Sequence, residues 1–380
     1  ALCSIGVGSG CECLQDLSAG LDGVLSPCEP PLYWYLREQS GPEGRDNKQL
    51  EVVRALVDAG ADANLISANG KESISHFIIY VKPEIRDYLL SLKPDLSKLD
   101  YDGHSPASRW LNFNHDDPAA LEVFEKLLAC GVDPNHIDGR KPLLFHAIEA
   151  GKPFVEAVLK AGANPELVEE RGNRTALYAA CEADSPEIVE LLISKGANCN
   201  ATDKKGVSVL LYAIEDLAGN PHNSEIVAAL LAHGADPNLA AEKRNNLTPL
   251  IAAVREDRLP VVQVLLKAGA KPDAQVKNGR TALIFALYDR QPDAADLVAA
   301  LLDGGANPNL ADHEQITPAA YALGMPSLAA LKLLVARGAD LKAALALREK
   351  EGSPTLGEII KQSDRAELEE IKAYLKEQGL

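Results

Sequence analysis

A phrase of the form Gly-Ala-Asp-Pro-Asn, followed by a polar stretch and then by Thr-Pro-Leu, returns along the chain at a nearly constant interval. When the glycine marks each copy, and Lys93 fills one gap, successive separations run from 31 to 41 residues and average about 35. The ten markers are Gly60, Lys93, Gly131, Gly162, Gly196, Gly234, Gly269, Gly305, Gly338 and Gly379. A period of this size predicts stacked structural repeats rather than one globule.

Each period contains the same local signals. In EIVELLISKGAN, one helical face should carry Ile188, Val189, Leu191 and Leu192. The Gly196 that follows can take the left-handed conformation that ends a helix. Pro after Asp or Asn then favours an extended path, and pairs such as Asp-Gly or Lys-Gly favour a tight turn. Thr248-Pro249 is suited to cap and begin a new helix, so each unit should be turn, helix, short loop and helix.

These motifs resemble the ankyrin-repeat family, whose pattern reads G-x-T-P-L-H-x-A-A and later L-L-x-x-G-A-D-x-N. The segments LTPLIAAV, RTALYAAC, RTALIFAL and ITPAAYAL align with one another on this pattern, although no unit has histidine at its His position. The resemblance covers residues 26–380 and implies an all-α solenoid of about ten helix-turn-helix units with β-turn or hairpin loops. Residues 26–64 and 352–380 should cap its ends, after a cysteine-rich arm at 1–25.

Composition narrows the classes of function. The net charge of -17 argues against a surface for nucleic acid or anionic lipid, because either would need clustered Lys and Arg. No apolar run approaches the ~18 residues of a membrane helix. Only 5% of the residues are aromatic, which fits the thin core of a repeat stack better than one large globular core.

The first residues suggest export. The sequence opens at Ala1 without Met, and Cys3, Cys11, Cys13 and Cys28 crowd its start. We expect a periplasmic protein or one anchored by lipid in a bacterial envelope, with these cysteines oxidised or one of them lipid-modified; four cysteines allow three pairings. The VGSGC stretch lacks the usual Leu of a lipoprotein site, so a trimmed cytoplasmic chain with reduced thiols stays open.

Motifs for catalysis are missing from the sequence. It contains no His-Glu-x-x-His pair, nucleophile elbow or Walker loop, and the GVGSG at residues 6–10 has no following Lys-Ser/Thr. Ten repeats also occupy almost the whole length. We expect no enzyme activity, no cofactor and no metal site, and we interpret His136 and His146 as surface or packed residues.

The repeat geometry predicts where a partner protein would bind. Turns and first helices line the concave side of such a stack, and the residue after the motif's His position should face it. These residues are Trp34, His76, Arg109, Phe145, Ala179, Tyr212, Ala252, Phe285, Tyr321 and Glu358. Five of the ten are aromatic, and Tyr80, Phe113 and Tyr288 lie three or four residues further on. Exposed rings with Arg are typical of interface hot spots, although the rings could instead fill the stack.

Polar groups add to this surface. Residues expected at the tips of the turns are Tyr101, His136, Arg171, Lys204, Arg244, Lys277 and His313. Glu149, Glu182, Glu215 and Asp216 fall in the groove of the middle units, which predicts one protein partner that is basic where it docks.

Two functions remain in view. The first is a non-catalytic protein-binding module, and the exported-looking start makes it similar to envelope immunity proteins that neutralise a secreted phospholipase effector. The second is an intracellular scaffold or host-directed ankyrin effector. The residues encoded before Ala1 and the neighbouring gene would separate the two.

Overall fold

The computed structural model describes residues 32–33, 35–36, 49–64, 77–99, 103–217, 219–288, 294–323, 328–350 and 366–379. In this part of the chain almost all regular structure is helical, so the predicted all-α fold is confirmed. The chain divides into two compact units, Ala1–Glu170 (unit 1) and Arg171–Leu380 (unit 2). The arm at 1–25 lies outside the described residues.

Unit 1 is built from helical pairs and one small hairpin. Its described elements are α3 (Gln49–Asp58), α5 (Pro83–Ser91), α6 (Pro106–Asn114), α7 (Ala120–Ala129), β1 (Ile137–Asp138), β2 (Lys141–Pro142), α8 (Leu143–Ala150) and α9 (Lys152–Lys160). The first helices α6 and α8 pack on each other, as do the second helices α7 and α9, and each first helix packs on its own second helix. Strands β1 and β2 pair antiparallel, with Ile137 opposite Pro142.

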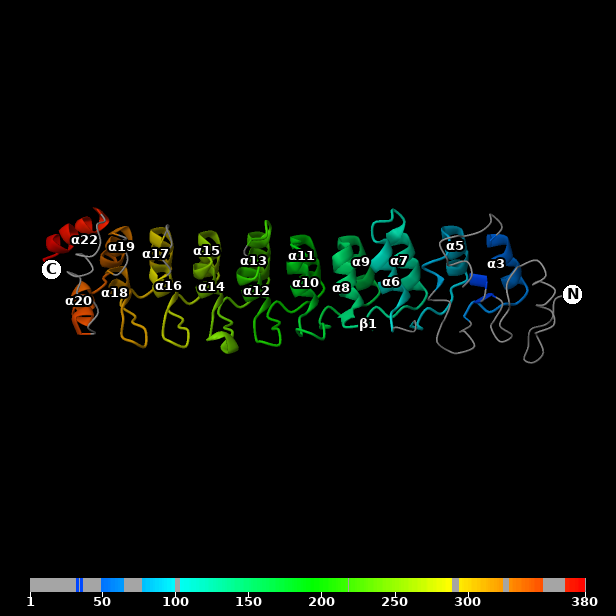
Figure 1. The fold of residues 1–380 in the computed structure, drawn as a ribbon, viewed down its shortest axis with the longest axis horizontal. Helices are drawn as coiled ribbons and strands as arrows, with labels where there is room; N and C mark the ends of the chain where they lie inside the picture. The colour runs from blue at the N-terminus through cyan, green and yellow to red at the C-terminus, as the bar shows by residue number, and fades with distance from the viewer. Residues whose placement is uncertain are drawn as a thin grey trace. The chain divides into compact units, whose positions relative to one another are not determined.

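Unit 2 repeats this arrangement over more copies. Its elements are α10 (Ala176–Glu182), α11 (Pro186–Ser194), α12 (Val209–Glu215), α13 (Asn223–Ala232), η1 (Glu242–Arg244), α14 (Pro249–Arg255), α15 (Leu259–Lys267), α16 (Ala282–Tyr288), α17 (Ala294–Asp303), α18 (Pro318–Leu323), α19 (Leu328–Ala336), α20 (Leu341–Lys350) and α22 (Ala366–Glu377). First helices α10, α12, α14, α16, α18 and α20 form one layer, and second helices α11, α13, α15, α17, α19 and α22 form the other. The turns before α12, α14, α16 and α18 project to the same side (Figure 1).

The helix stops lie where the sequence predicts them. All ten markers of the repeat have positive φ, from 74° to 98° at the nine glycines and 52° at Lys93. Glycine adopts this region at no steric cost, whereas an L residue with a side chain is strained in it. The recurring glycine is therefore a backbone requirement, and Lys93 meets it under strain.

The starts of most first helices also follow the motif, whereas Pro142 before α8 and Thr175 before α10 make no side-chain cap bond. Hydroxyl oxygens at five N-caps accept a hydrogen bond from the backbone N–H three residues on: Ser105, Ser208, Thr248, Thr281 and Thr317. Pro249 occupies the first turn after Thr248, as predicted. Thr175 makes no such bond, and its buried Oγ1 has no hydrogen-bond partner.

Asparagine side chains join consecutive repeats behind the turns. Within unit 2, Asn200 accepts from the Asp236 N–H at 2.7 Å and donates to the Gly234 carbonyl at 3.1 Å. The same pair of bonds recurs at Asn135 in unit 1 and at Asn238 and Asn309 in unit 2. Within unit 2, Asp273 stands at this position between α15 and α16, and it only accepts, from the Asn307 N–H at 2.8 Å. This junction thus lacks the donor that an amide supplies.

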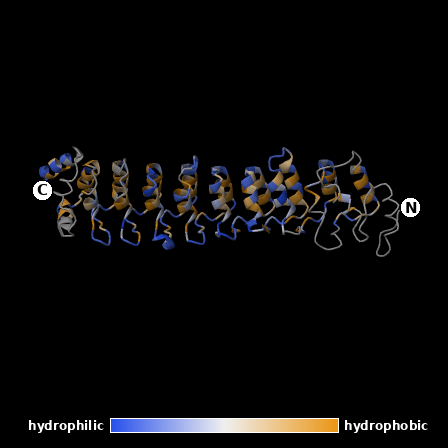
Figure 2. Ribbon diagram, viewed as in Figure 1, coloured by the Kyte–Doolittle hydropathy of each residue, from blue (hydrophilic) through white to orange (hydrophobic). Residues whose placement is uncertain are grey.

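The core of each unit lies between the two helical layers. Figure 2 shows hydrophobic residues gathered on the helices and hydrophilic ones on the turns of unit 2. Cys130, Cys181 and Cys199 are buried, as expected of small core residues. Trp110 is fully buried, with its indole N–H donating to the Ala120 carbonyl at 2.9 Å and the Arg86 guanidinium 4.5 Å from its ring.

Candidate functional site

The predicted aromatic positions are more buried than an exposed stripe requires. Phe145 and Tyr212 are 5% and 7% exposed, so the expectation of exposure is wrong at these two. The cause is packing between repeats, which covers the residue after the motif's His position. Arg109, Phe285 and Tyr321 are half-buried and remain accessible. Ala179 is half-buried and Ala252 is buried. The positions or side chains of the remaining predicted residues lie outside the described part of the chain: Trp34, His76, Tyr101, Tyr288 and Glu358.

A first polar cluster joins two repeats of unit 2 around Tyr212. The Tyr212 hydroxyl donates to Glu182 Oε1 at 2.5 Å, and Arg174 Nη1 lies 2.7 Å from the same oxygen. The Arg174 guanidinium also covers the Tyr212 ring at 4.5 Å, and the Tyr178 ring is 5.3 Å away. Burial, together with the hydrogen bond to Glu182, raises the pKa of Tyr212. The hydroxyl therefore stays protonated as a fixed donor.

A second polar cluster joins α12 to the turn of the following repeat. Arg244, at the end of η1, makes a bidentate contact with Glu215 at 2.5 and 2.9 Å. The Glu215 side chain is only 14% exposed, and burial raises its pKa while Arg244 opposes this shift. The planar fork of arginine fixes both the position and the orientation of this carboxylate.

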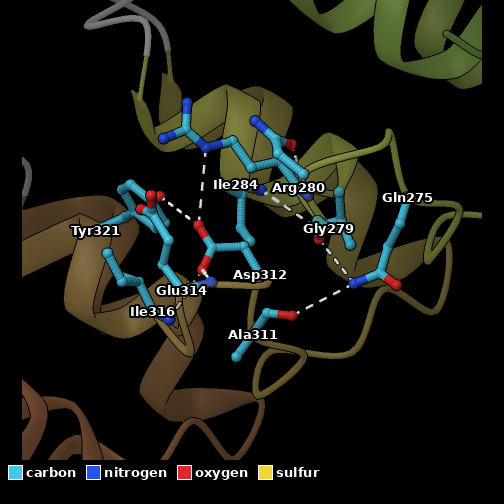
Figure 3. A network of polar contacts seen from close by, with 11 residues as sticks. Gln275, Gly279, Arg280, Ile284, Ala311, Asp312, Glu314, Ile316 and Tyr321 are labelled. Atoms are coloured by element: carbon cyan, nitrogen blue, oxygen red, sulfur yellow. Dashed lines mark hydrogen bonds and ion pairs between the residues drawn. The ribbon is translucent and has the colours of Figure 1, made fainter. Parts of the chain in front are cut away.

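A third cluster surrounds Asp312, whose side chain is 1% exposed (Figure 3). Tyr321 donates to Asp312 Oδ2 at 2.6 Å, and Arg280 Nε lies 3.7 Å from the same atom. The N–H groups of Glu314 and Ile316 both donate to Oδ1 at 3.0 Å. Burial and the bond to Asp312 raise the pKa of Tyr321 to about 12. The half-buried ring of Tyr321 is thus held in one orientation.

The groove is less acidic than the sequence suggests. Glu182 and Glu215 are paired as described, and in unit 1 Glu149 is paired with Lys141 at 2.5 Å. Asp216 is exposed. At each of the three glutamates a turn residue supplies a cation, which balances part of the negative charge that the sequence predicts there.

The turn tips mostly reach solvent. Arg171, Lys204, Lys277 and His313 are exposed, whereas His136 is half-buried and bonded through Nε2 to the Gly103 carbonyl at 3.0 Å. In unit 1, Tyr80 and Phe113 are 42% and 67% exposed, as the extension of the stripe predicts.

Several side chains of these clusters and turns are not predicted from the sequence. Arg174 and Arg280 each stand directly before the motif threonine, in NRTAL and GRTAL, and this recurrence was the available signal. Lys205 and Lys243, exposed beside predicted tip residues, were also missed. In the described part of the chain, no group of three or more His, Cys, Asp or Glu side chains could hold a metal ion. No described helix has the length and apolarity to cross a bilayer.

Known families match this architecture. The profile described as "Ankyrin repeats (3 copies)" matches residues 116–203 and 198–276, and "Ankyrin repeat" matches residues 278–313, together just over half of the chain. The chain belongs to the ankyrin-repeat family. The resemblance seen in the sequence is thereby confirmed at the level of the family.

Individual ankyrin-repeat proteins are similar over shorter stretches. B-cell lymphoma 3 protein homolog of Mus musculus is 29% identical over 229 residues, covering 58% of this chain and 48% of that protein. NF-kappa-B inhibitor delta of Mus musculus is 32% identical over 200 residues, covering 46% and 59%. The crystal structure of the ankyrin repeat domain of Bcl-3 aligns with a TM-score of 0.52 at 26% identity, over 62% of this chain and 99% of that one. The chain thus spans less than two thirds of these curated relatives, and its family is one of protein-interaction modules.

Proposed function

We propose that the chain is a non-catalytic module that binds one partner protein through the first helices and turns of unit 2. The observation that carries this proposal is the half-buried pair Phe285 and Tyr321, one repeat apart on α16 and α18. The Arg280 and Asp312 contacts fix the Tyr321 ring before any partner arrives. Fixed aromatic side chains bind with little loss of conformational entropy.

We also propose a specific role for this module, as an immunity protein. An immunity protein that neutralises a secreted phospholipase effector would use this surface to cover the effector's active site, from the periplasm or a lipid anchor. Its support is the cluster of four cysteines near the start of the sequence. The relative named NF-kappa-B inhibitor delta gives a precedent in the family for an inhibitory name.

An intracellular scaffold is the second candidate. Two buried free thiols, Cys130 and Cys181, suit a reducing compartment, because disulfides are rare there. Localisation decides between the two candidates. Inhibition of a phospholipase by the purified chain would support the first, and a cytoplasmic partner would support the second.

The structure bears on the charge that we expect at the partner's docking surface. The sequence predicts a partner that is basic where it docks. Pairing of Glu149, Glu182 and Glu215 balances part of this negative charge, and exposed Asp216 adds to it, so a basic docking surface on the partner stays a prediction.

Truncating the two rings tests the binding surface. A partner is first obtained by co-purification with the product of the neighbouring gene, and its affinity is then measured by calorimetry. We expect Phe285→Ala with Tyr321→Ala to weaken binding at least about tenfold, as loss of two interface aromatics does. Glu190→Ala, exposed on α11, is the matched control and should bind normally. Equal affinity of both variants would reject unit 2's first-helix face as the interface.

A further inference from the structure

The turn tips of unit 2 carry a row of positive charge in a chain whose net charge is -17. We define the basic row as the exposed residues Arg171, Lys204, Lys205, Lys243 and Lys277. These residues come from four consecutive turns, so each repeat contributes at least one cation to the same edge.

The basic row lacks carboxylate partners. Among the described residues, no Asp or Glu oxygen lies within 4 Å of any of its five cationic groups. The carboxylate of Asp203 is held by backbone N–H groups of Lys205 and Val207, at 2.8 and 2.9 Å. Asp312 is buried and Glu215 is bound by Arg244. Asp203, Glu215 and Asp312 are thus engaged by other groups, whereas Glu170 and Glu242 are exposed beside Arg171 and Lys243 in the sequence.

Hydrogen bonds between turns fix the spacing of the row. The Lys204 N–H donates to the Gly172 carbonyl at 2.8 Å, and the Lys277 N–H donates to the Asn245 carbonyl at 3.0 Å. Lys243 Nζ donates to the Lys204 carbonyl at 3.0 Å and keeps two N–H groups for another acceptor. Consecutive turns are therefore held in register, at the spacing of the packed helices that they precede.

The spacing between consecutive turns favours one backbone conformation for an acidic segment bound along the row. Packed helices lie about 8–10 Å apart. A polyproline II segment rises about 3.1 Å per residue with three residues per turn, so every third side chain recurs on one side after about 9 Å. In a β-strand successive side chains alternate, and every third residue would change face.

We propose that the basic row binds an extended acidic segment of the partner protein, with Asp or Glu at every third residue. This inference rests on the proposed function and specifies the chemistry of the partner at the turns. Association should be fast at low ionic strength and weaken with added salt, because exposed charges are screened beyond about 8–10 Å.

Two synthetic peptides of about 15 residues test the periodicity. One carries five Glu at every third position in a Pro/Ala background, and the other has the same composition with the five Glu consecutive. Fluorescence anisotropy with the full chain at low salt should show the periodic peptide binding about fivefold to tenfold more tightly. Equal binding of the two peptides would overturn the spacing argument.

Paired lysine variants test whether the basic row itself binds the peptide. Lys204→Gln with Lys277→Gln should weaken the periodic peptide about fivefold to tenfold, since each exposed contact contributes modestly. Lys195→Gln with Lys267→Gln removes two exposed lysines at the ends of second helices, and it should leave affinity unchanged. Circular dichroism checks that both variants remain folded.

Two further results would contradict the proposed acidic segment. A single-stranded oligonucleotide of equal charge that binds more tightly than the peptide, and depends on Lys204 and Lys277, would overturn the acidic-peptide assignment. If no peptide binds while partner affinity still depends on Phe285 and Tyr321, this inference fails and the proposed function stands.

Discussion

Two buried aspartates, one in each unit, are stabilised in different ways. Asp312 in unit 2 accepts from the Tyr321 hydroxyl and two backbone N–H groups and lies beside Arg280. Asp138 in unit 1 is as buried, but its side chain is bonded to His104, and its Oδ2 has no hydrogen-bond partner. A buried carboxylate with several donors tolerates the loss of one, whereas a carboxylate with a single partner does not.

Removing the single partner should have the largest effect. We expect His104→Ala to destabilise unit 1 by about 2–3 kcal/mol, because Asp138 would be left buried without a donor. Arg280→Gln should cost unit 2 about 1 kcal/mol, since Tyr321 and the backbone N–H groups remain. Hydrogen exchange followed peptide by peptide in urea measures each unit separately, which a repeat array requires.

The double variant His104→Ala, Asp138→Asn is the control for this comparison. It removes the charge and should recover part of the loss in unit 1. If His104→Ala and Arg280→Gln cost the same, the number of partners is not what sets the tolerance of these aspartates.

The residues at which helices end should give a smaller difference in stability between the two units. Where second helices end, unit 2 has glycine at each described position, whereas unit 1 has Lys93 at φ 52° after α5. We expect Lys93→Gly to stabilise unit 1 by about 0.5–1 kcal/mol, because relief of left-handed strain exceeds the added entropy of the unfolded chain. Gly338→Ala should destabilise unit 2 by about 1 kcal/mol for the converse reason. Local unfolding free energies from hydrogen exchange measure both changes, and a destabilising Lys93→Gly would contradict the strain.

The smallest effect is a pH dependence of opposite sign in the two units. Burial lowers the pKa of His146 in unit 1 below its usual 6.5, and the bond to Asp184 raises the pKa of His222 in unit 2 above it. Below about pH 6.5 the unfolded chain binds more protons than folded His146, so acid weakens unit 1. Folded His222 binds protons more tightly than the unfolded chain does; its contribution is complete below that pH and is lost as the pH rises through its folded pKa.

Hydrogen exchange around α8 and α13, between pH 7.5 and 5.5 and corrected for intrinsic rates, should show these opposite trends. His146→Gln and His222→Gln should each abolish the trend in their own unit. Trends of the same sign in both units would contradict the assignment.

Much of the fold could be predicted because its signals are local. Glycine at a helix stop and Thr248 at a helix start act through neighbouring backbone groups, so their spacing alone places them. The burial of Tyr212 and the pairing of Glu215 could not be read in this way. Both depend on side chains from the next repeat, Arg244 among them, whose approach is set by turn conformation rather than by any single motif.

The exchange of asparagine for Asp273 has a mechanical consequence. In a stack where each repeat is stabilised chiefly by its neighbours, separation begins at the weakest junction. The carbonyl of Gly305 receives no bond from Asp273, unlike its equivalents opposite Asn238 and Asn309. Within unit 2, we expect a pulling force to detach α16 to α22 together, as one block, before α10 to α15 come apart.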